Sequence, residues 1–350
     1  MKDKVSSAQD IDMTINCEGF SLPESPLLGA QTRDALRCQA VEAKEAAAGG
    51  GPVSDIPPTR EESREQFYQS SNYKKLRERY AVDVVGDLIN GVYTETITPK
   101  AGVSKDNAER VLINFHGGSF QFGSRTNSQL ESIPVAALGN IKVVSVDYRM
   151  YPEHRFPAAT EDALTVYKAL LENYSPNNIG IFGTSSGAQL TAQLLYRLIE
   201  LDEPLPAAVA MIAEGATRLE GDSIGMTAPL FKAQTGMDLA DALIEPYFET
   251  ASQDEPRVNP ALDECALEHF PPSFLASSTR DICLSPVIAT HRKLLQQGVE
   301  AELHIWEGLE HFFHANVDLP ETEELHQCML NFFERHFVDV IPEYSARGSV

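Results

Sequence analysis

Basic residues are scarce in this chain of 350 residues. Its 28 Lys and Arg residues stand against 51 Asp and Glu residues, which gives a formal net charge of −23 at pH 7. A protein with this charge repels phosphate backbones and anionic lipid headgroups. The charge therefore argues against a nucleic-acid partner and favours a neutral or cationic small molecule as ligand.

The start of the chain lacks a long apolar run. Met1–Phe20 contains four acidic residues and no continuous apolar stretch, which is the pattern of neither a signal peptide nor a membrane span. We therefore expect a cytoplasmic protein without a membrane span. An exported protein is the alternative, if a leader preceded Met1.

Cysteines are few and scattered. Their number is odd and their positions lack the spacing of metal ligands, which argues against a full disulfide framework. The five are Cys17, Cys38, Cys265, Cys283 and Cys328. A bridge between Cys17 and Cys38 stays open for an exported form, although we expect none. We expect neither a metal nor a cofactor, because the pair His311 and His314 has no third ligand placed nearby.

The hydrophobic share of 43% is enough for a substantial core. We expect residues 1–90 to form an N-terminal cap segment, in which Thr59 and Glu62 fit a capping box before a helix over 60–70. A partly disordered tail is the alternative for residues 1–52. Residues 91–350 are expected to form the catalytic domain, with a cap insertion near 221–267.

Beyond Asn90, strand and helix patterns alternate, and no internal repeat is visible. Runs such as Val111–Phe115 and Val143–Val146 consist mainly of apolar or β-branched residues, as in strands buried on both faces of a parallel sheet, whereas Val92–Thr98 alternates like an exposed edge strand. Further strands are predicted at 207–213, 273–278 and 301–306, and helices at 160–171, 185–199, 284–297 and 321–337. This order predicts an α/β fold with a mostly parallel, doubly wound sheet.

Gly183-Thr-Ser-Ser-Gly187 is the most informative segment of the chain. It follows an apolar strand pattern and precedes a helical one. This context is typical of a nucleophile elbow, in which glycines allow a tight turn around an exposed serine. The pentapeptide also occurs in ordinary strand-to-helix turns, but here it makes Ser185 the candidate nucleophile.

A serine hydroxyl needs a base to remove its proton. Asp281 follows the predicted strand over 273–278, and His311 follows the strand over 301–306. Both come after Ser185 in the order serine, acid, histidine, which predicts a Ser-His-Asp triad. Asp254 and Asp263 are alternatives to Asp281, and His314 is the alternative to His311.

An oxyanion requires preorganised donors, and glycines let backbone amides approach a substrate closely. The segment His116–Phe120 follows a predicted strand. We expect the amides of Gly117, Gly118 and Ser186 to form a three-donor oxyanion hole. Three aromatic residues are expected either to line the substrate pocket or to belong to the core: Phe120, Phe122 and Tyr148.

Together these motifs resemble the hormone-sensitive-lipase-like family of α/β-hydrolase esterases, which includes many bacterial carboxylesterases. The resemblance spans roughly residues 91–337 and rests on His116–Phe120, Asp147–Arg149 with Pro152 and Glu153, Gly183–Gly187, Asp281 and His311. It implies an α/β-hydrolase fold with a helical cap, no metal, and esters with short acyl chains as substrates. Phe312 departs from the family, where glycine is common.

The sequence therefore predicts a serine carboxylester hydrolase that acts on a small-molecule ester through an acyl-enzyme. A lactone or amide hydrolase is the main alternative, because the same acyl chemistry serves these substrates. A non-catalytic receptor of the same fold is less favoured, since His311 is present. Whether the protein forms a homodimer is left open.

Overall fold

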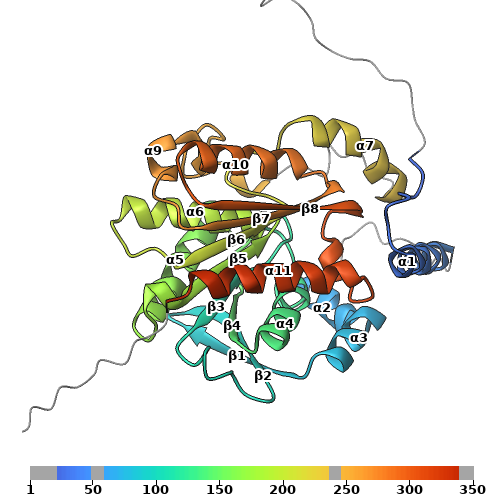
Figure 1. Ribbon diagram of the computed structural model, residues 1–350, viewed down its shortest axis with the longest axis horizontal. Helices are drawn as coiled ribbons and strands as arrows, with labels where there is room; N and C mark the ends of the chain where they lie inside the picture. The colour runs from blue at the N-terminus through green and yellow to red at the C-terminus, as the bar shows by residue number, and fades with distance from the viewer. Residues whose placement is uncertain (1–21, 49–58, 236–245, 339–350) are drawn as a thin grey trace, which may run out of the picture.

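The computed structural model describes residues 22–48, 59–235 and 246–338 of the chain (Figure 1). Within them, one sheet has the strand order β1-β2-β4-β3-β5-β6-β7-β8. The strands are β1 (Val82–Ile89), β2 (Val92–Pro99), β3 (Val111–Phe115), β4 (Lys142–Val146), β5 (Ile179–Thr184), β6 (Ala208–Ile212), β7 (Ser273–Arg280) and β8 (Ala301–Glu310). The pairs β1–β2 and β2–β4 are antiparallel, and all others are parallel. The predicted α/β class is confirmed.

Helices cover both faces of this sheet (Figure 1). The described helices are α1 (Ala30–Ala48), α2 (Arg60–Gln69), α3 (Ser71–Arg79), α4 (Asn127–Gly139), α5 (Ala158–Leu171), α6 (Ser186–Glu200), α7 (Asp222–Thr235), α9 (Glu264–Leu267), α10 (Leu284–Gln296) and α11 (Pro320–His336). The core is correspondingly divided into two clusters. Along β3, Val111 and Ile113 belong to the cluster that contains residues of α5, α6 and α10, whereas Leu112 belongs to the cluster that contains residues of α4 and α11. Burial on both faces explains why four of the five residues of this strand are apolar.

The antiparallel end of the sheet differs from the sequence-based expectation. The predicted edge strand over 92–98 is not an edge, because β2 lies between β1 and β4. The outer strand is β1, of which six residues from Val84 to Ile89 are exposed or half-buried. Its apolar residues are interrupted by Asp83, Gly86 and Asp87 and do not alternate regularly, so sequence reasoning missed it.

The predicted N-terminal cap segment contains α1, α2, α3 and β1. Because β1 belongs to the main sheet, the sheet begins at Val82, before the expected boundary at residue 90. In α2 the predicted capping box is present, with Thr59 and Glu62 each accepting a hydrogen bond from the other's backbone amide. None of the described helices combines the length and apolar character that a membrane crossing requires.

Two predictions fall partly on residues outside the described ranges. The pairing of Cys17 with Cys38 is one, since Cys17 lies outside them and Cys38 is exposed. The cap insertion near 221–267 is the other, and its described part contains α7 and α9. The first turn of α7 is tied to the loop after β7, because Ser223 Oγ donates to Ile282 O at 2.6 Å.

Candidate active site

Ser185 lies at a sharp turn between β5 and α6. Its φ of 53° is in the left-handed region, and its amide donates to Ile212 O of β6 at 2.8 Å. A Cβ atom at Gly183 would lie 2.3 Å from Gly187 O, and one at Gly187 would lie 1.8 Å from Phe115 O. Both glycines are therefore required by close backbone approach, which is the geometry of a nucleophile elbow.

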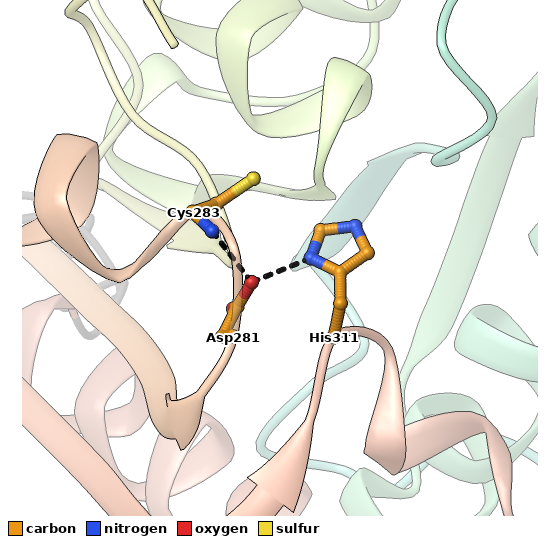
Figure 2. A group of neighbouring side chains, drawn as sticks. All are labelled: Asp281, Cys283 and His311. Atoms are coloured by element: carbon orange, nitrogen blue, oxygen red, sulfur yellow. Dashed lines mark hydrogen bonds and ion pairs between the residues drawn. The ribbon is translucent and has the colours of Figure 1, made fainter. Parts of the chain in front are cut away.

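His311 connects Ser185 with Asp281. Its Nε2 atom lies 3.1 Å from Ser185 Oγ, and its Nδ1 atom lies 2.7 Å from Asp281 Oδ1. Figure 2 shows the His311 ring facing the Asp281 carboxylate across two neighbouring loops. With the proton on Nδ1 donated to the carboxylate, Nε2 is free to accept the serine proton. The chemistry available to this arrangement is nucleophilic attack by an activated serine.

Asp281 is held in place at the end of β7. Its Oδ1 accepts the Cys283 amide at 2.8 Å, and its Oδ2 accepts the Ser277 hydroxyl at 2.8 Å. Burial would raise the pKa of Asp281, but the charge of His311 and these hydrogen bonds bring the pKa below its usual 3.8. The carboxylate is thus ionised and fixed toward the imidazole.

The pKa of His311 is raised above its usual 6.5. Burial alone would lower it, but the charge of Asp281 and its hydrogen bond to the imidazole outweigh burial. A raised pKa makes His311 a stronger acceptor for the serine proton.

Asp281, Cys283 and His311 are also the one group within the described ranges whose ligand atoms gather closely enough to suggest a metal site (Figure 2). Two ligands about 2.1 Å from a tetrahedral zinc ion stand about 3.4 Å apart. The 2.7 Å separation of His311 Nδ1 and Asp281 Oδ1 is shorter. Their contact therefore has the geometry of a hydrogen bond, and the absence of a metal stays a prediction.

The segment His116–Phe120 lies beside Ser185, at the end of β3, and is called the oxyanion loop below. Gly117 is a correction to the predicted donors, because its amide already donates to Glu131 Oε1 at 3.0 Å. The amides of Gly118, Ser119 and Ser186 have no acceptor among the described residues. Ser119, with a φ of 53°, is a candidate donor that sequence reasoning missed.

Two of the three predicted pocket aromatics are packing residues. Phe120 has no exposed surface and stacks on Tyr247 with ring centroids 4.5 Å apart. Tyr148 is 1% exposed, stacks on His116 and donates to His116 O at 2.6 Å. Phe120 and Tyr148 therefore offer no surface to a substrate. Both pack within the core and hold the oxyanion loop in place. Phe122 is 55% exposed.

The alternative triad members have other partners. His314 is buried, and its Nε2 lies 3.1 Å from Thr184 Oγ1. Asp254 pairs with Arg218, and Asp263 caps the N-terminus of α9. None of these three is bonded to Ser185 or His311 in the described part of the chain.

Comparison with known proteins places this chain in a family. Residues 112–315 match the family model of the alpha/beta hydrolase fold. An esterase of Acinetobacter venetianus is 27% identical over 238 residues, which cover 67% of this chain and 76% of that protein. An acetyl-hydrolase of Streptomyces hygroscopicus is 29% identical over 216 residues, which cover 61% of this chain and 71% of that protein.

Solved structures agree with these relatives. The crystal structure of an esterase, E25, has a TM-score of 0.77 at 29% identity and covers 93% of this chain and 100% of its own. The structure of an esterase from the bacterial hormone-sensitive lipase family has a TM-score of 0.73 at 22% identity and covers 89% of this chain and 100% of its own. This likeness shows that the two proteins share the fold. The chain belongs to the alpha/beta hydrolase fold family, and its identification from sequence as an enzyme related to esterases is confirmed.

Proposed function

We propose that this protein is a serine carboxylester hydrolase with Ser185, His311 and Asp281 as its catalytic triad. The observation that carries the proposal is the continuous hydrogen-bonded series from Ser185 Oγ through the His311 ring to Asp281 Oδ1. Its chain order and its position at the ends of β5, β7 and β8 are those expected for an α/β hydrolase.

In the proposed mechanism, Ser185 Oγ attacks the ester carbonyl carbon while His311 Nε2 takes the hydroxyl proton. The negative charge on the carbonyl oxygen is stabilised by the amides of Gly118, Ser119 and Ser186. His311 then gives the proton to the departing alcohol, which leaves an acyl-enzyme. A water molecule, deprotonated by His311, attacks the acyl carbon, and release of the acid restores Ser185.

We further propose that the acyl group is short. The acetyl-hydrolase of Streptomyces hygroscopicus, by its name a hydrolase of acetyl groups, supports this choice. A lactone or amide hydrolase remains the alternative, because the same triad serves these leaving groups. Comparison of kcat/KM across p-nitrophenyl esters of increasing acyl length, with a lactone and an anilide alongside, distinguishes these substrates.

The variant Ser185→Ala tests the proposal. It removes only the nucleophilic oxygen, so we expect kcat for p-nitrophenyl butyrate to fall by about 10⁴-fold or more with unchanged thermal stability. Ser273→Ala is a matched control, since the hydroxyl of this buried serine donates to Pro271 O, at the opposite end of β7 from Asp281, and has no other partner in the described part of the chain. We expect the control to keep wild-type kcat.

A fully active Ser185→Ala protein would contradict the proposal. A serine-directed organophosphonate gives a second measurement, because it should attach to Ser185 of the wild type and stop turnover. A folded wild-type protein that neither reacts with this reagent nor hydrolyses any ester would instead support the non-catalytic receptor.

A further inference from the structure

A carboxyl group is buried beneath the oxyanion loop. Glu131 lies in α4, within the segment Ser128–Ala136, which is buried along its whole length, and is itself 1% exposed. Its Oε1 accepts the Gly117 amide at 3.0 Å, and its Oε2 accepts Asn114 Nδ2 at 2.9 Å. The mechanism above gives this carboxyl no role, although it bonds the loop that faces the nucleophile.

The contacts of Glu131 connect the loop with three strands. Asn114 belongs to β3, and its Oδ1 accepts the hydroxyl of Ser145 on β4 at 2.8 Å. The hydroxyl of Thr184, at the end of β5 and next to the nucleophile, lies close enough to the carboxyl to favour its ionised form. One side chain therefore bonds both the first glycine amide of the oxyanion loop and β3, beside the residue that precedes Ser185.

The loop has little freedom at this point. A Cβ atom at Gly117 would lie 3.0 Å from Thr184 O and 3.4 Å from Ser185 Cβ. The backbone of Gly117 is thus packed directly against the nucleophile turn. A shift of the Gly117 amide would move the next two amides, Gly118 and Ser119, relative to Ser185 Oγ.

Glu131 provides two acceptor oxygens, and two are needed because the neighbouring groups, the Gly117 amide and Asn114 Nδ2, both present N–H groups. Burial raises the pKa of Glu131 to about 8, and the hydrogen bonds from Gly117 and Asn114, together with the nearby Thr184 hydroxyl, oppose that rise. An apolar residue at this position would leave the Gly117 amide buried without an acceptor. The chain thus retains a carboxyl where burial disfavours its charge.

We propose that Glu131 is a positioning residue for ester hydrolysis. It holds the Gly117 amide so that the unpaired amides of Gly118 and Ser119 face the carbonyl oxygen of the substrate. The inference rests on the proposed function. It predicts that Glu131 acts on the transition state, in which charge develops on that oxygen, more than on substrate binding.

The variant Glu131→Gln tests this role with a nearly isosteric side chain. If the oxygen of the introduced amide accepts the Gly117 amide, the introduced NH₂ group meets the NH₂ group of Asn114, so one contact is lost. We expect kcat for p-nitrophenyl butyrate to fall by about 10- to 100-fold with little change in KM. The affinity for a trifluoromethyl ketone, which forms a tetrahedral adduct on Ser185, should fall by a similar factor.

The double variant Asn114→Asp/Glu131→Gln is designed to rescue this loss. In it the carboxylate and the amide exchange places, so that the new carboxylate on β3 accepts from the new amide on α4 and still accepts from Ser145. We expect most of the lost kcat and ketone affinity to return. Rescue of both quantities is a result that a general loss of stability would not produce.

Gln129→Met is the matched control. Gln129 is on the same helix, is 3% exposed, and donates to Glu95 Oε1 at 2.8 Å, away from the loop. We expect this variant to lose thermal stability and keep wild-type kcat. In the wild type, amide hydrogen exchange should be slow at Gly117 and fast at Gly118 and Ser119, which gives a test that needs no variant.

Wild-type kcat and ketone affinity in Glu131→Gln would overturn the inference, and so would equal exchange at the three loop amides. A Glu131→Gln protein that loses activity in proportion to its fold, with no recovery in the double variant, would overturn it as well. These outcomes leave the proposed function intact. A wild-type protein without Ser185-dependent hydrolysis would overturn both.

Discussion

Burial and the neighbouring Asp281 carboxylate change the pKa of His311 in opposite directions. Burial favours the neutral imidazole, whereas Asp281 favours the imidazolium and prevails, so the pKa of His311 is raised above 6.5. Because only the neutral ring accepts the serine proton, kcat/KM should rise with pH and level off above this pKa. The pH profile of the enzyme thus reports the contact between two side chains.

Asp281→Asn should change that profile in a defined direction. Without the carboxylate charge, burial alone acts on His311, so its pKa falls and the rise of kcat/KM moves to lower pH. The plateau should drop by about 10⁴-fold, because an amide does not hold the required tautomer. Measurement of kcat/KM for p-nitrophenyl butyrate between pH 5 and pH 9 tests both effects.

Asp263→Asn serves as the control for this experiment, since Asp263 caps α9 and has no bond to the imidazole. Its profile should coincide with that of the wild type. A profile of Asp281→Asn displaced to higher pH would contradict the assigned contact.

The roles of some site residues can be predicted from the sequence, and those of others cannot. Ser185, Asp281 and His311 were selected from their order and from their places after strands. Gly117 was expected to serve as an oxyanion donor, and this was wrong because its partner, Glu131, lies 14 residues further along the chain. The only local signal for Glu131 was one acidic residue amid a largely apolar stretch, which does not reveal what it bonds.

Secondary-structure elements were predictable where one periodicity dominated. The predicted strands over 111–115 and 273–278 correspond to β3 and to most of β7. Helix α4 was missed because Pro134 lies inside it and because its polar residues gather in the first half and are buried, so that no exposed polar face runs along the helix. The element that bears Glu131 therefore left no helical pattern in the sequence.

Arg60, the first residue of α2, bonds the residue that follows the oxyanion loop and the loop after β4. Arg60 Nε donates to Gln121 O at 3.0 Å, Arg60 Nη2 donates to Tyr151 O, and Arg60 Nη1 pairs with Glu153 at 2.8 Å. We expect Arg60→Met to destabilise the docking of α2 by roughly 1 kcal/mol, because these contacts are partly exposed. Amide exchange across α2 should become about fivefold faster.

Arg64→Met is the corresponding control within the same helix. Arg64 Nε donates to Arg60 O, a bond that stays inside α2, so its loss should leave the docking unchanged. Equal exchange rates in the two variants would show that Arg60 does not hold this helix in place.

At the scale of the whole molecule, the net charge of −23 acts on every approaching ligand. An anionic ester, such as a p-nitrophenyl hemisuccinate, is repelled at low ionic strength, and added salt screens this repulsion. We expect its kcat/KM to rise at least about twofold between 10 mM and 300 mM NaCl. The neutral p-nitrophenyl butyrate should show no comparable change, and a parallel rise for both esters would exclude this explanation.

The strand β6 bonds the nucleophile turn and leads into the segment over 221–267. It lies between β5 and β7, yet none of the three proposed triad residues directly follows it. Its Ile212 carbonyl accepts a hydrogen bond from the Ser185 amide, and the chain then enters residues 221–267, where we expect a cap insertion. Within that segment, Ser223 Oγ donates to Ile282 O beside Asp281, and Tyr247 stacks on Phe120 of the oxyanion loop. The segment is thus in contact with both sides of the proposed site, so a change of substrate preference made there has to preserve these two contacts.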